Sequence, residues 1–493
     1  MALPKICGIE TEYGISVRES SEFNPILTSS LLINAYAQPA FKRVKWDYEE
    51  ENPLRDARGF ERAGADATVE DDSGLVNVIL PNGARYYVDH AHPEYSSPEC
   101  SNPRDAVVWD KAGERILESS IEAAHAIVPD GDRVFIYKNN SDGKGNSYGC
   151  HENYLVSRQT PFPSLVKHLI PFFVTRQVIV GAGKVGTENG AGQVDYQISQ
   201  RADFFEVEVG LETTFKRPII NTRDEPHADP ERYRRLHVIV GDANMSEIST
   251  FLKIGMTSLI LKLIEDDFIE DDFTLAEPIR SMRAVSHDPA CRSTISLADG
   301  RSITAVELQW EYLRLCRKYA QDNDGDEMTT DVLERWERTL ERLETDPMSL
   351  RNELDWVAKL SVLEAYRNRD GLEWNDPKLK LIDLQYHDVR RSKGLYYRLA
   401  RSGKIARLVS DAEIDYAIDH PPEDTRAYFR GECLRRFSPD IVAASWDALI
   451  FDVGDEPLKK VPTLEPTKGT KTHVEALFRD SPDAAALIRN LGT

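Results

Sequence analysis

Two absences limit what this chain can be: no cysteines are paired at metal-site spacing, and no apolar run is long. Its six cysteines are scattered over 493 residues, so neither a disulfide framework nor a zinc site is expected. Scattered thiols are typical of a reducing compartment, and we expect a cytoplasmic protein. The first residues lack the apolar run of a signal peptide, and no stretch is long enough for a transmembrane helix.

Positive charge is also scarce, since 61 Lys and Arg residues face 83 Asp and Glu residues, for a net charge of −22. A surface of this sign repels nucleic acids and anionic membranes, so we expect no partner of either kind. With 41% hydrophobic residues, the chain can still bury one large core and a smaller satellite core. We expect a monomer.

The densest chemistry lies at residues 85–99. An apolar run and an Asn-Gly turn signal at 78–83 precede it, which predicts the second strand of a β-hairpin. Side chains alternate along a strand, so one face carries Arg85, Tyr87 and Asp89. The opposite face carries Tyr86, Val88 and His90.

Two prolines, Pro93 and Pro98, predict that regular pairing ends after this strand and that a loop begins. The predicted loop carries Glu94, Ser96, Ser97 and Glu99. Carboxylates bind hard cations, whereas hydroxyls and arginine bind phosphate oxygens, so the stretch indicates a metal–phosphate site. A solvated hairpin with ordinary surface charges is the alternative.

Residues 6–17 alternate and are β-branched, which predicts a strand. Glu10 and Glu12 lie two residues apart and share a face of it. Two neighbouring carboxylates repel each other, so on a buried face they need a cation or a basic partner. An exposed strand face with both acids in water is the alternative.

Two histidines follow on other predicted strands. His151 shares a strand face with Asn153, and His237 is predicted at the start of a strand that leads into a helix at 247–265. Together with the strand carboxylates they fit an oxygen-rich magnesium or manganese site, although a single histidine is more often structural. Cys150 points to the opposite face from His151, so the two cannot form a thiol-protease pair.

Two familiar motifs fail on context. Residues 178–186 match Gly-x-Gly-x-x-Gly after an apparent strand, but no helix follows that could hold a pyrophosphate. Residues 322–327 resemble a calcium loop, but the glycine stands at the fourth position rather than the sixth. We reject both.

The remaining chain shows a long loop, a helical half and a basic segment. Residues 45–76 are charged and have little periodicity, which predicts a long mobile loop before the site strand. Helices are predicted at 27–41, 105–127, 306–320, 330–344 and 350–368. Residues 390–407 hold seven cations and no acid, which indicates an acidic partner; a solvated helix face near a loop is the alternative.

Five strings along the chain are long and distinctive. They are Gly-Ile-Glu-Thr-Glu-Tyr-Gly at 8–14, Asn-Gly-Ala-Arg-Tyr-Tyr-Val-Asp-His-Ala-His-Pro-Glu-Tyr at 82–95, Ser-Tyr-Gly-Cys-His-Glu-Asn-Tyr at 147–154, Arg-Pro-Ile-Ile-Asn-Thr-Arg-Asp-Glu-Pro-His at 217–227 and Arg-Arg-Leu-His-Val-Ile-Val-Gly-Asp-Ala-Asn-Met-Ser-Glu at 234–247. Together they resemble the actinobacterial family of the Pup ligase and the Pup deamidase/depupylase. Within it, the inserted loop at 45–76 and the spacing of residues 88–94 resemble the deamidase branch.

The resemblance implies an α+β, glutamine-synthetase-like fold. A curved, mainly antiparallel β-sheet cradled by helices is expected at 1–419, with a small C-terminal domain at 420–493. It also implies two activities, hydrolysis of the side-chain amide of Pup's C-terminal glutamine and hydrolysis of the isopeptide bond between Pup and a substrate lysine. Pup and pupylated proteins are thus the implied partners, with ATP and Mg²⁺ as cofactors.

Site residues follow from the same resemblance, position by position. Asp89 matches the catalytic aspartate. The metal-site positions match Glu10, Tyr87, Glu94, His151 and His237. The ATP-contacting positions match Glu10, Thr11, Glu12, Tyr13, Gly14, Arg85, Ser96, Ser97, Asn153 and Trp446.

The chemistry of the residues agrees with this assignment. Asp89 could attack the amide carbonyl directly or deprotonate a water, and both need its carboxylate ionised. A cation and an arginine such as Arg217 or Arg223 could stabilise the oxyanion. Three alternatives stay open at this point: an ATP-consuming Pup ligase, a glutamine-synthetase-like ligase for small molecules, and a non-catalytic Pup-binding adaptor. The intact set of site residues argues against the adaptor.

Overall fold

The computed structural model describes residues 5–17, 24–37, 44–49, 51–59, 76–127, 134–454 and 457–492. Its centre is a six-stranded sheet in which every neighbouring pair is antiparallel, in the order β13-β8-β1-β6-β5-β4. The strands are β13 (Tyr233–Val238), β8 (Cys150–Ser157), β1 (Cys7–Glu12), β6 (His92–Ser96), β5 (Arg85–Asp89) and β4 (Asn77–Ile79). The prediction of an α+β fold around an antiparallel sheet is confirmed.

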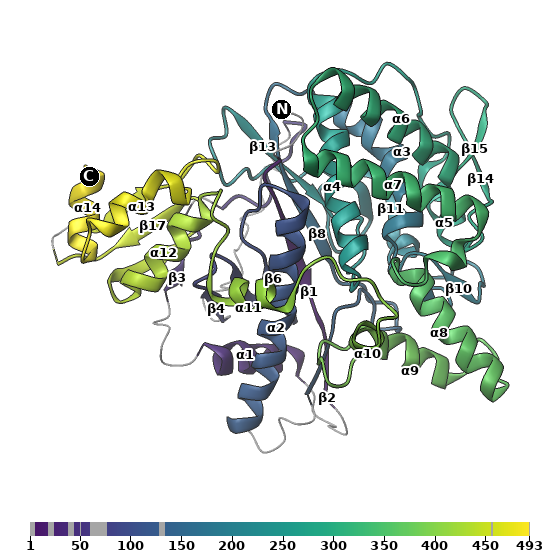
Figure 1. The fold of residues 1–493 in the computed structure, drawn as a ribbon, viewed down its shortest axis with the longest axis horizontal. Helices are drawn as coiled ribbons and strands as arrows, with labels where there is room; N and C mark the ends of the chain where they lie inside the picture. The colour runs from purple at the N-terminus through teal and green to yellow at the C-terminus, as the bar shows by residue number, and fades with distance from the viewer. Residues whose placement is uncertain are drawn as a thin grey trace.

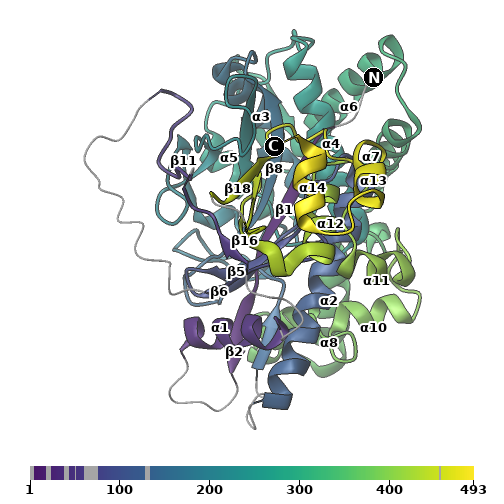
Figure 2. The same cartoon turned by 90° about the vertical axis from the view of Figure 1, so that its left-hand side faces the viewer.

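One face of this sheet is apolar and lies against helices. Its buried side chains alternate with half-buried polar ones along β1, β5 and β8. Two long helices, α2 (Pro103–Ile127) and α4 (Glu247–Glu265), run behind this face, as Figures 1 and 2 show. Because apolar residues recur every second position, the polar residues between them all point to the opposite, uncovered face.

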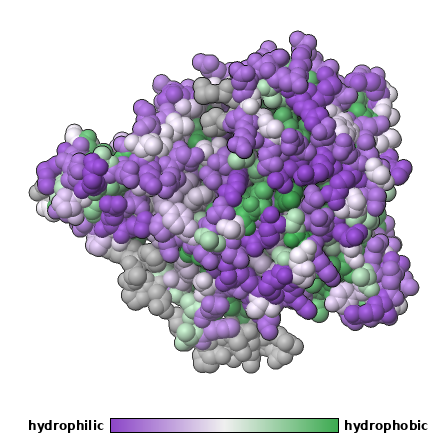
Figure 3. Space-filling model, in the orientation of Figure 1, coloured by the Kyte–Doolittle hydropathy of each residue, from purple (hydrophilic) through white to green (hydrophobic). Residues whose placement is uncertain are grey.

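A helical half covers the sheet beyond α4 (Figure 1). It shares one large hydrophobic core with β1, β8 and β13. Its helices are α3 (Phe162–Val180), α5 (Pro278–Ser286), α6 (Ala305–Asp322), α7 (Glu327–Thr345), α8 (Asp355–Asp370), α9 (Pro377–Tyr386), α10 (Leu395–Arg401) and α11 (Asp411–Asp419). A second core joins β4, β5 and α2 to α1 (Pro25–Tyr36). The visible surface is mainly hydrophilic, as the composition predicts (Figure 3).

The C-terminal residues build a separate core of their own, drawn in yellow at the left of Figure 1. It contains α12 (Ala427–Phe437), β16 (Ile441–Ala444), β17 (Ala448–Phe451), β18 (Lys459–Pro462), α13 (Lys471–Arg479) and α14 (Ala484–Leu491). A distant strand, β3 (Lys45–Trp46), completes its sheet by pairing in parallel with β16. The boundary at residue 420 stays a prediction.

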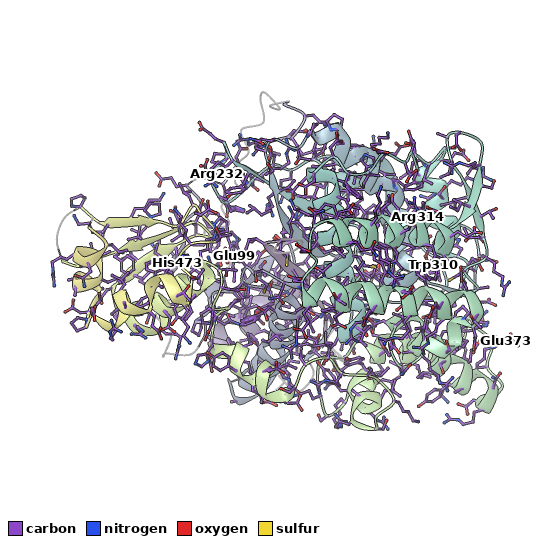
Figure 4. All side chains as sticks on the ribbon, turned by 45° about the horizontal axis from the view of Figure 1, so that its top comes forward. Glu99, Arg232, Trp310, Arg314, Glu373 and His473 are labelled. Atoms are coloured by element: carbon purple, nitrogen blue, oxygen red, sulfur yellow. The ribbon has the colours of Figure 1, made fainter. Side chains whose placement is uncertain are left out.

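A buried ion-pair group joins this C-terminal part to the main sheet. Glu99, labelled in Figure 4, accepts hydrogen bonds from Arg426 (Nε to Oε1, 2.7 Å) and Arg430 (Nη1 to Oε1, 3.2 Å). Both arginine side chains are almost fully buried. Burial alone would raise the pKa of Glu99, but the charges of Arg430 and Arg426 lower it to about 2.

We expect Glu99→Gln to lower the free energy of unfolding by about 3 kcal/mol at neutral pH, because it leaves two buried guanidinium groups without their counterion. The effect should fade as the pH falls from about 4.3, the ordinary carboxyl pKa, towards 2, since wild-type Glu99 loses its charge there. Urea unfolding at several pH values measures both. The exposed pair Glu423–Lys471 is the control, because Glu423→Gln should change nothing measurable. Equal effects of the two substitutions would contradict the prediction.

Strand β6 corrects the prediction that pairing ends at Pro93. Pro93 lies opposite Val88 of β5, but the Val88 N–H bonds instead to the Val76 carbonyl on the other side. The Pro93 carbonyl points away from β5 and accepts from the Tyr13 N–H at 3.0 Å, so the missing N–H of Pro93 costs no hydrogen bond between β5 and β6. Glu94 and Ser96 are consequently strand residues rather than loop residues.

Three smaller predictions were wrong. His90 does not share a strand face with Tyr86, because it forms an exposed turn with φ 51°. His237 is the second-last residue of β13, not the start of a strand. Residues 178–180 end helix α3, so no strand precedes the rejected Gly-x-Gly-x-x-Gly motif. In the predicted loop at 45–76, the described residues include β3, and residues 60–75 lie outside the described part.

Candidate active site

The uncovered face of the sheet gathers most of the predicted site residues into rows across the strands. Glu10 of β1 stands between Ser96 of β6 and His151 of β8. One row further along, Glu12 stands opposite Glu94, which in turn faces Tyr87 of β5. The predicted faces of β1, β5 and β8 are thus confirmed, and antiparallel register brings together residues far apart in sequence.

A first cluster consists of Glu10, His151 and His237. One ligand atom from each lies within 4.8 Å of the others. The Asn153 side chain connects them, since its amide donates to Glu10 Oε1 (2.8 Å) and its oxygen lies 3.0 Å from His237 Nδ1. That oxygen also accepts from Arg235 (2.8 Å), so the proton of the histidine contact is on Nδ1 and Nε2 is free to bind a metal.

The surrounding charges and the burial of this first cluster set the protonation states of its members to those that bind a cation. Burial opposes ionisation of Glu10, but the hydrogen bond with His151 and the charge of Arg235, 3.5 Å away, hold its pKa well below the ordinary value. Burial, together with the nearby Arg235, holds the pKa of His237 well below its usual range. An ionised carboxylate beside a neutral imidazole is a suitable ligand pair for a divalent metal.

A second cluster consists of three carboxylates, Glu12, Asp89 and Glu94, again within 4.8 Å of one another. Burial and the charges of Asp89, Glu10 and Glu12 raise the pKa of Glu94 well above the ordinary value. The protein thus crowds negative charge here without matching it. A hard cation such as Mg²⁺ fits such an all-oxygen donor set.

Asp89 is the accessible member of this second cluster. Its side chain is 36% exposed, whereas that of Glu12 is 12% exposed and Glu94 is buried. Asp89 Oδ2 lies 2.6 Å from His90 Nδ1. Although burial opposes it, this hydrogen bond and the charge of His90 lower the pKa of Asp89. An ionised carboxylate at the open end of a metal cluster can attack a carbonyl or deprotonate a water.

Beside the clusters lies a cavity that reaches the C-terminal part. Its lining includes five predicted ATP-contacting residues, Glu10, Ser96, Ser97, Asn153 and Trp446. Gly8 lies there too, and its backbone passes close to Ser97, whose hydroxyl accepts from the Ile9 N–H at 3.0 Å. Hydroxyls and an aromatic ring in one cavity are groups that can contact the phosphates and the base of a nucleotide.

Three predicted ATP-contacting residues are placed differently. The side chains of Thr11 and Tyr13 point to the covered face, where Thr11 lies 3.5 Å from Cys150 Sγ and Tyr13 is fully buried. They can meet a nucleotide only through their backbone. Gly14 is packed against Tyr148 and Asn139, at the far end of β1 from the cavity.

Sequence reasoning missed two contributions to this site. Arg235 joins Asn153 to Glu225 and lines the nucleotide cavity. Trp46 packs on Arg85, whose guanidinium carbon lies 4.0 Å from the Trp46 ring centroid and 3.8 Å from that of Tyr87. The alternation of residues 233–238 could have revealed Arg235, but nothing local could have placed Trp46 next to the site.

The basic segment at 390–407 presents less unpaired positive charge than its sequence indicates. Three of its seven cations are paired with carboxylates: Arg390 with Asp388, Arg391 with Glu118, and Arg407 with Glu247. The exposed side chains of Lys393, Arg398 and Lys404 have no such pair within the described residues. No helix in the described ranges combines the length and the hydropathy needed to cross a membrane.

Comparison with known sequences gives matches along nearly the whole chain. The family model described as "Pup-ligase protein" matches residues 5–450. The depupylase of Acidothermus cellulolyticus is 59% identical over 499 residues, covering 99% of both chains. The Pup deamidase/depupylase of Mycolicibacterium smegmatis is 53% identical over 498 residues, covering 99% of this chain and 100% of its own.

Two solved structures of the ligase share the fold. The complex of the prokaryotic ubiquitin-like protein Pup with its ligase PafA superposes with a TM-score of 0.81 at 34% identity, covering 97% of this chain and 92% of the other. The ligase PafA in complex with ADP gives a TM-score of 0.75 at 38% identity, covering 82% and 89%. The chain therefore belongs to the Pup ligase family, whose members include Pup ligases and Pup deamidase/depupylases.

Proposed function

We propose that this protein is a Pup deamidase and depupylase. It hydrolyses the side-chain amide of Pup's C-terminal glutamine to glutamate, and it cleaves the isopeptide bond between Pup and a lysine of a pupylated protein. The relatives at 53–59% identity carry these names, whereas the ligases are more distant at 34–38%. We propose that it acts in the cytoplasm, where its six free cysteines would stay reduced. We also propose that it acts as a monomer.

The observation that carries the proposal is the position of Asp89. Its carboxylate is ionised and half-exposed, and it belongs to a carboxylate cluster on the sheet face that also lines the nucleotide cavity. A carboxylate so placed can either form a covalent bond to the substrate carbonyl or take a proton from water. Both routes end in the same products, an acid and a released amine or ammonia.

The cofactors that fit this face are ATP and Mg²⁺. Glu10, His151 and His237 would hold one cation, and Glu12 and Glu94 would hold another, with Tyr87 beside Glu94 and Asp89 left for the chemistry. When bound, Mg²⁺ neutralises these carboxylates and polarises nearby oxygens. Arg85, held between Trp46 and Tyr87, presents a fixed positive charge towards the same face. An arginine such as Arg217 or Arg223 would stabilise the oxyanion.

One assay tests the function. A Pup conjugate with a reporter amine on its C-terminal glutamate is mixed with the protein and Mg-ATP, and amine and ADP are followed together. We expect many turnovers of amine with little ADP, because nucleotide serves as a cofactor. ADP formed in step with joining of free Pup to a lysine substrate would instead identify a ligase and overturn the proposal.

A further inference from the structure

Two of the predicted ATP-contacting residues come from parts of the fold with separate hydrophobic cores. Arg85 lies on β5 of the main sheet, opposite Ser96 of β6, and Ser96 lines the nucleotide cavity. Trp446 lines the same cavity from the C-terminal part, where it lies between β16 and β17. A nucleotide that contacts both residues needs the two parts to be held in a fixed arrangement.

Trp46 of β3 contacts both residues. The guanidinium carbon of Arg85 lies 4.0 Å from the Trp46 ring centroid, and the Trp446 ring centroid lies 5.4 Å from it, with the two ring planes at 74°. Trp46 is 6% exposed, and it is not among the described residues that line the cavity. It would therefore act on a nucleotide through the two neighbours on which it packs.

The contacts of Arg85 leave its outer nitrogens for a ligand. Its guanidinium carbon also lies 3.8 Å from the Tyr87 ring centroid, and its Nε donates to the Asn77 side-chain oxygen at 3.1 Å. Among the described residues, no group accepts a hydrogen bond from Nη1 or Nη2. The two rings and Asn77 thus fix the guanidinium, while its two outer nitrogens keep donors for phosphate oxygens.

Trp46 is itself fixed by the C-terminal part. Its Nε1 donates to Glu51 Oε1 at 2.6 Å. Strand β3 pairs in parallel with β16, which places Trp46 beside Ala444, two residues before Trp446. The Trp446 ring is covered in addition by Arg430, whose guanidinium carbon lies 5.0 Å from the ring centroid. One strand from the N-terminal half of the chain therefore carries the ring that joins Arg85 to Trp446.

We propose that Trp46 is a positioning residue for the nucleotide, because it holds Arg85 and Trp446 in one arrangement. The proposal rests on the proposed function, in which Mg-ATP is the cofactor. Trp46 has no hydrogen bond or ring contact with Asp89 or Glu94 among the described residues. It should therefore set how tightly Mg-ATP binds, and not the rate of hydrolysis once Mg-ATP is bound.

The test measures amine release from the reporter conjugate at increasing concentrations of Mg-ATP. We expect Trp46→Leu to raise the half-saturating concentration of Mg-ATP by about 30-fold, because it removes a buried contact between a cation and an aromatic ring. The KM for the conjugate, and kcat at saturating Mg-ATP, should stay within about threefold of wild type. Trp46→Phe keeps a ring for Arg85, so it should restore the half-saturating concentration to within about fivefold.

Two further variants separate positioning from loss of stability. Val44→Ala is the matched control, because Val44 is buried in the same C-terminal core two residues before Trp46 but offers no ring to Arg85. It should lower stability and leave the half-saturating concentration unchanged. Glu51→Ala keeps the Trp46 ring but removes its hydrogen bond, so it should raise that concentration by about threefold.

A double-mutant cycle gives a readout that a merely structural role would not change. In the wild-type background, the effects of Arg85→Lys and Trp446→Phe on the half-saturating concentration should depart from simple multiplication by about threefold or more, since both residues pack on one ring. In the Trp46→Leu background the two effects should multiply.

The outcomes separate two failures. If the wild-type protein releases no amine, or releases it without nucleotide, the proposed function or its cofactor fails. If the wild-type protein needs Mg-ATP but Trp46→Leu and Glu51→Ala leave the half-saturating concentration unchanged, the function stands and the inference is overturned. Equal increases in Trp46→Leu and Val44→Ala would show a general loss of C-terminal packing, which also overturns it.

Discussion

Replacing Asp89 by Asn is expected to abolish amine release while leaving nucleotide binding intact. Asn matches Asp in shape, so the 2.6 Å contact with His90 and the strand β5 can be kept. It has no ionised oxygen to attack a carbonyl or accept a proton, and the loss of such a group costs about 100-fold to 10,000-fold in rate. The substitution leaves Glu10, Glu12, Glu94 and the two histidines in place, so binding of Mg-ATP should persist.

Single-turnover hydrolysis of the reporter conjugate measures the rate, and calorimetry measures Mg-ATP affinity. Asp299→Asn is the control, because Asp299 lies in an exposed turn, where it accepts hydrogen bonds from Arg301. It should behave as the wild-type protein does. Turnover of Asp89→Asn within about tenfold of wild type would remove Asp89 from the chemistry and leave the cluster as a metal site alone.

The parts of the fold that were predictable are those encoded by neighbouring residues. Alternation placed Glu10 and Glu12 on one face, and the turn at Asn82-Gly83 fixed the hairpin of β4 and β5. The helix at 247–265 was predicted with the correct first residue, because Ser246 caps its N-terminus by accepting a hydrogen bond from the Ser249 N–H. In each case the physical cause lies within a few residues of its effect.

The parts that were missed depend on distant segments. Pro93 fits into β6 at a position whose carbonyl bonds to Tyr13 rather than to β5, and this register depends on segments distant in the chain. Trp46 reaches Arg85 because β3 joins the sheet of the C-terminal part, nearly 400 residues later in the chain. Arg201 is buried without an ion pair among the described residues, which is likewise a property of packing. A composition that counts cations cannot show which ones lack a carboxylate.

Charged groups are paired differently in the interior and on the polar face of the sheet. Several charged groups elsewhere in the interior are matched: Arg176 pairs with Glu152, and Lys138 pairs with Asp110 and Glu114. On the sheet face the matching is weaker: Glu12, Asp89 and Glu94 crowd together, and within the described residues His92 and His90, not a lysine or arginine, lie at ion-pair distance from Glu12 and Asp89. Unmatched charge lowers stability, so its concentration in one region marks where ligands supply the missing partners.

Glu94→Gln tests whether the excess negative charge is held for a cation. It should stabilise the ligand-free protein and abolish the stabilisation by Mg-ATP. Burial and three neighbouring acids raise the pKa of Glu94 well above its ordinary value, so its ionisation at neutral pH opposes folding. Neutral glutamine removes that repulsion. We therefore expect the free energy of unfolding of the metal-free protein, measured in urea, to rise by about 1–2 kcal/mol. The same substitution removes a metal ligand, so added Mg-ATP should no longer raise the melting temperature, and turnover should fall at least about 100-fold.

The sign of the first effect distinguishes a ligand site from a structural acid. Glu152 is the matched control, since it is buried on the covered face of β8 and paired with Arg176. Glu152→Gln should destabilise the protein by about 3 kcal/mol with or without ligand, because it leaves a buried arginine unpaired. If Glu94→Gln also destabilised the metal-free protein, the carboxylates of the second cluster would be supported by the protein itself. The excess negative charge would then not be held for a cation.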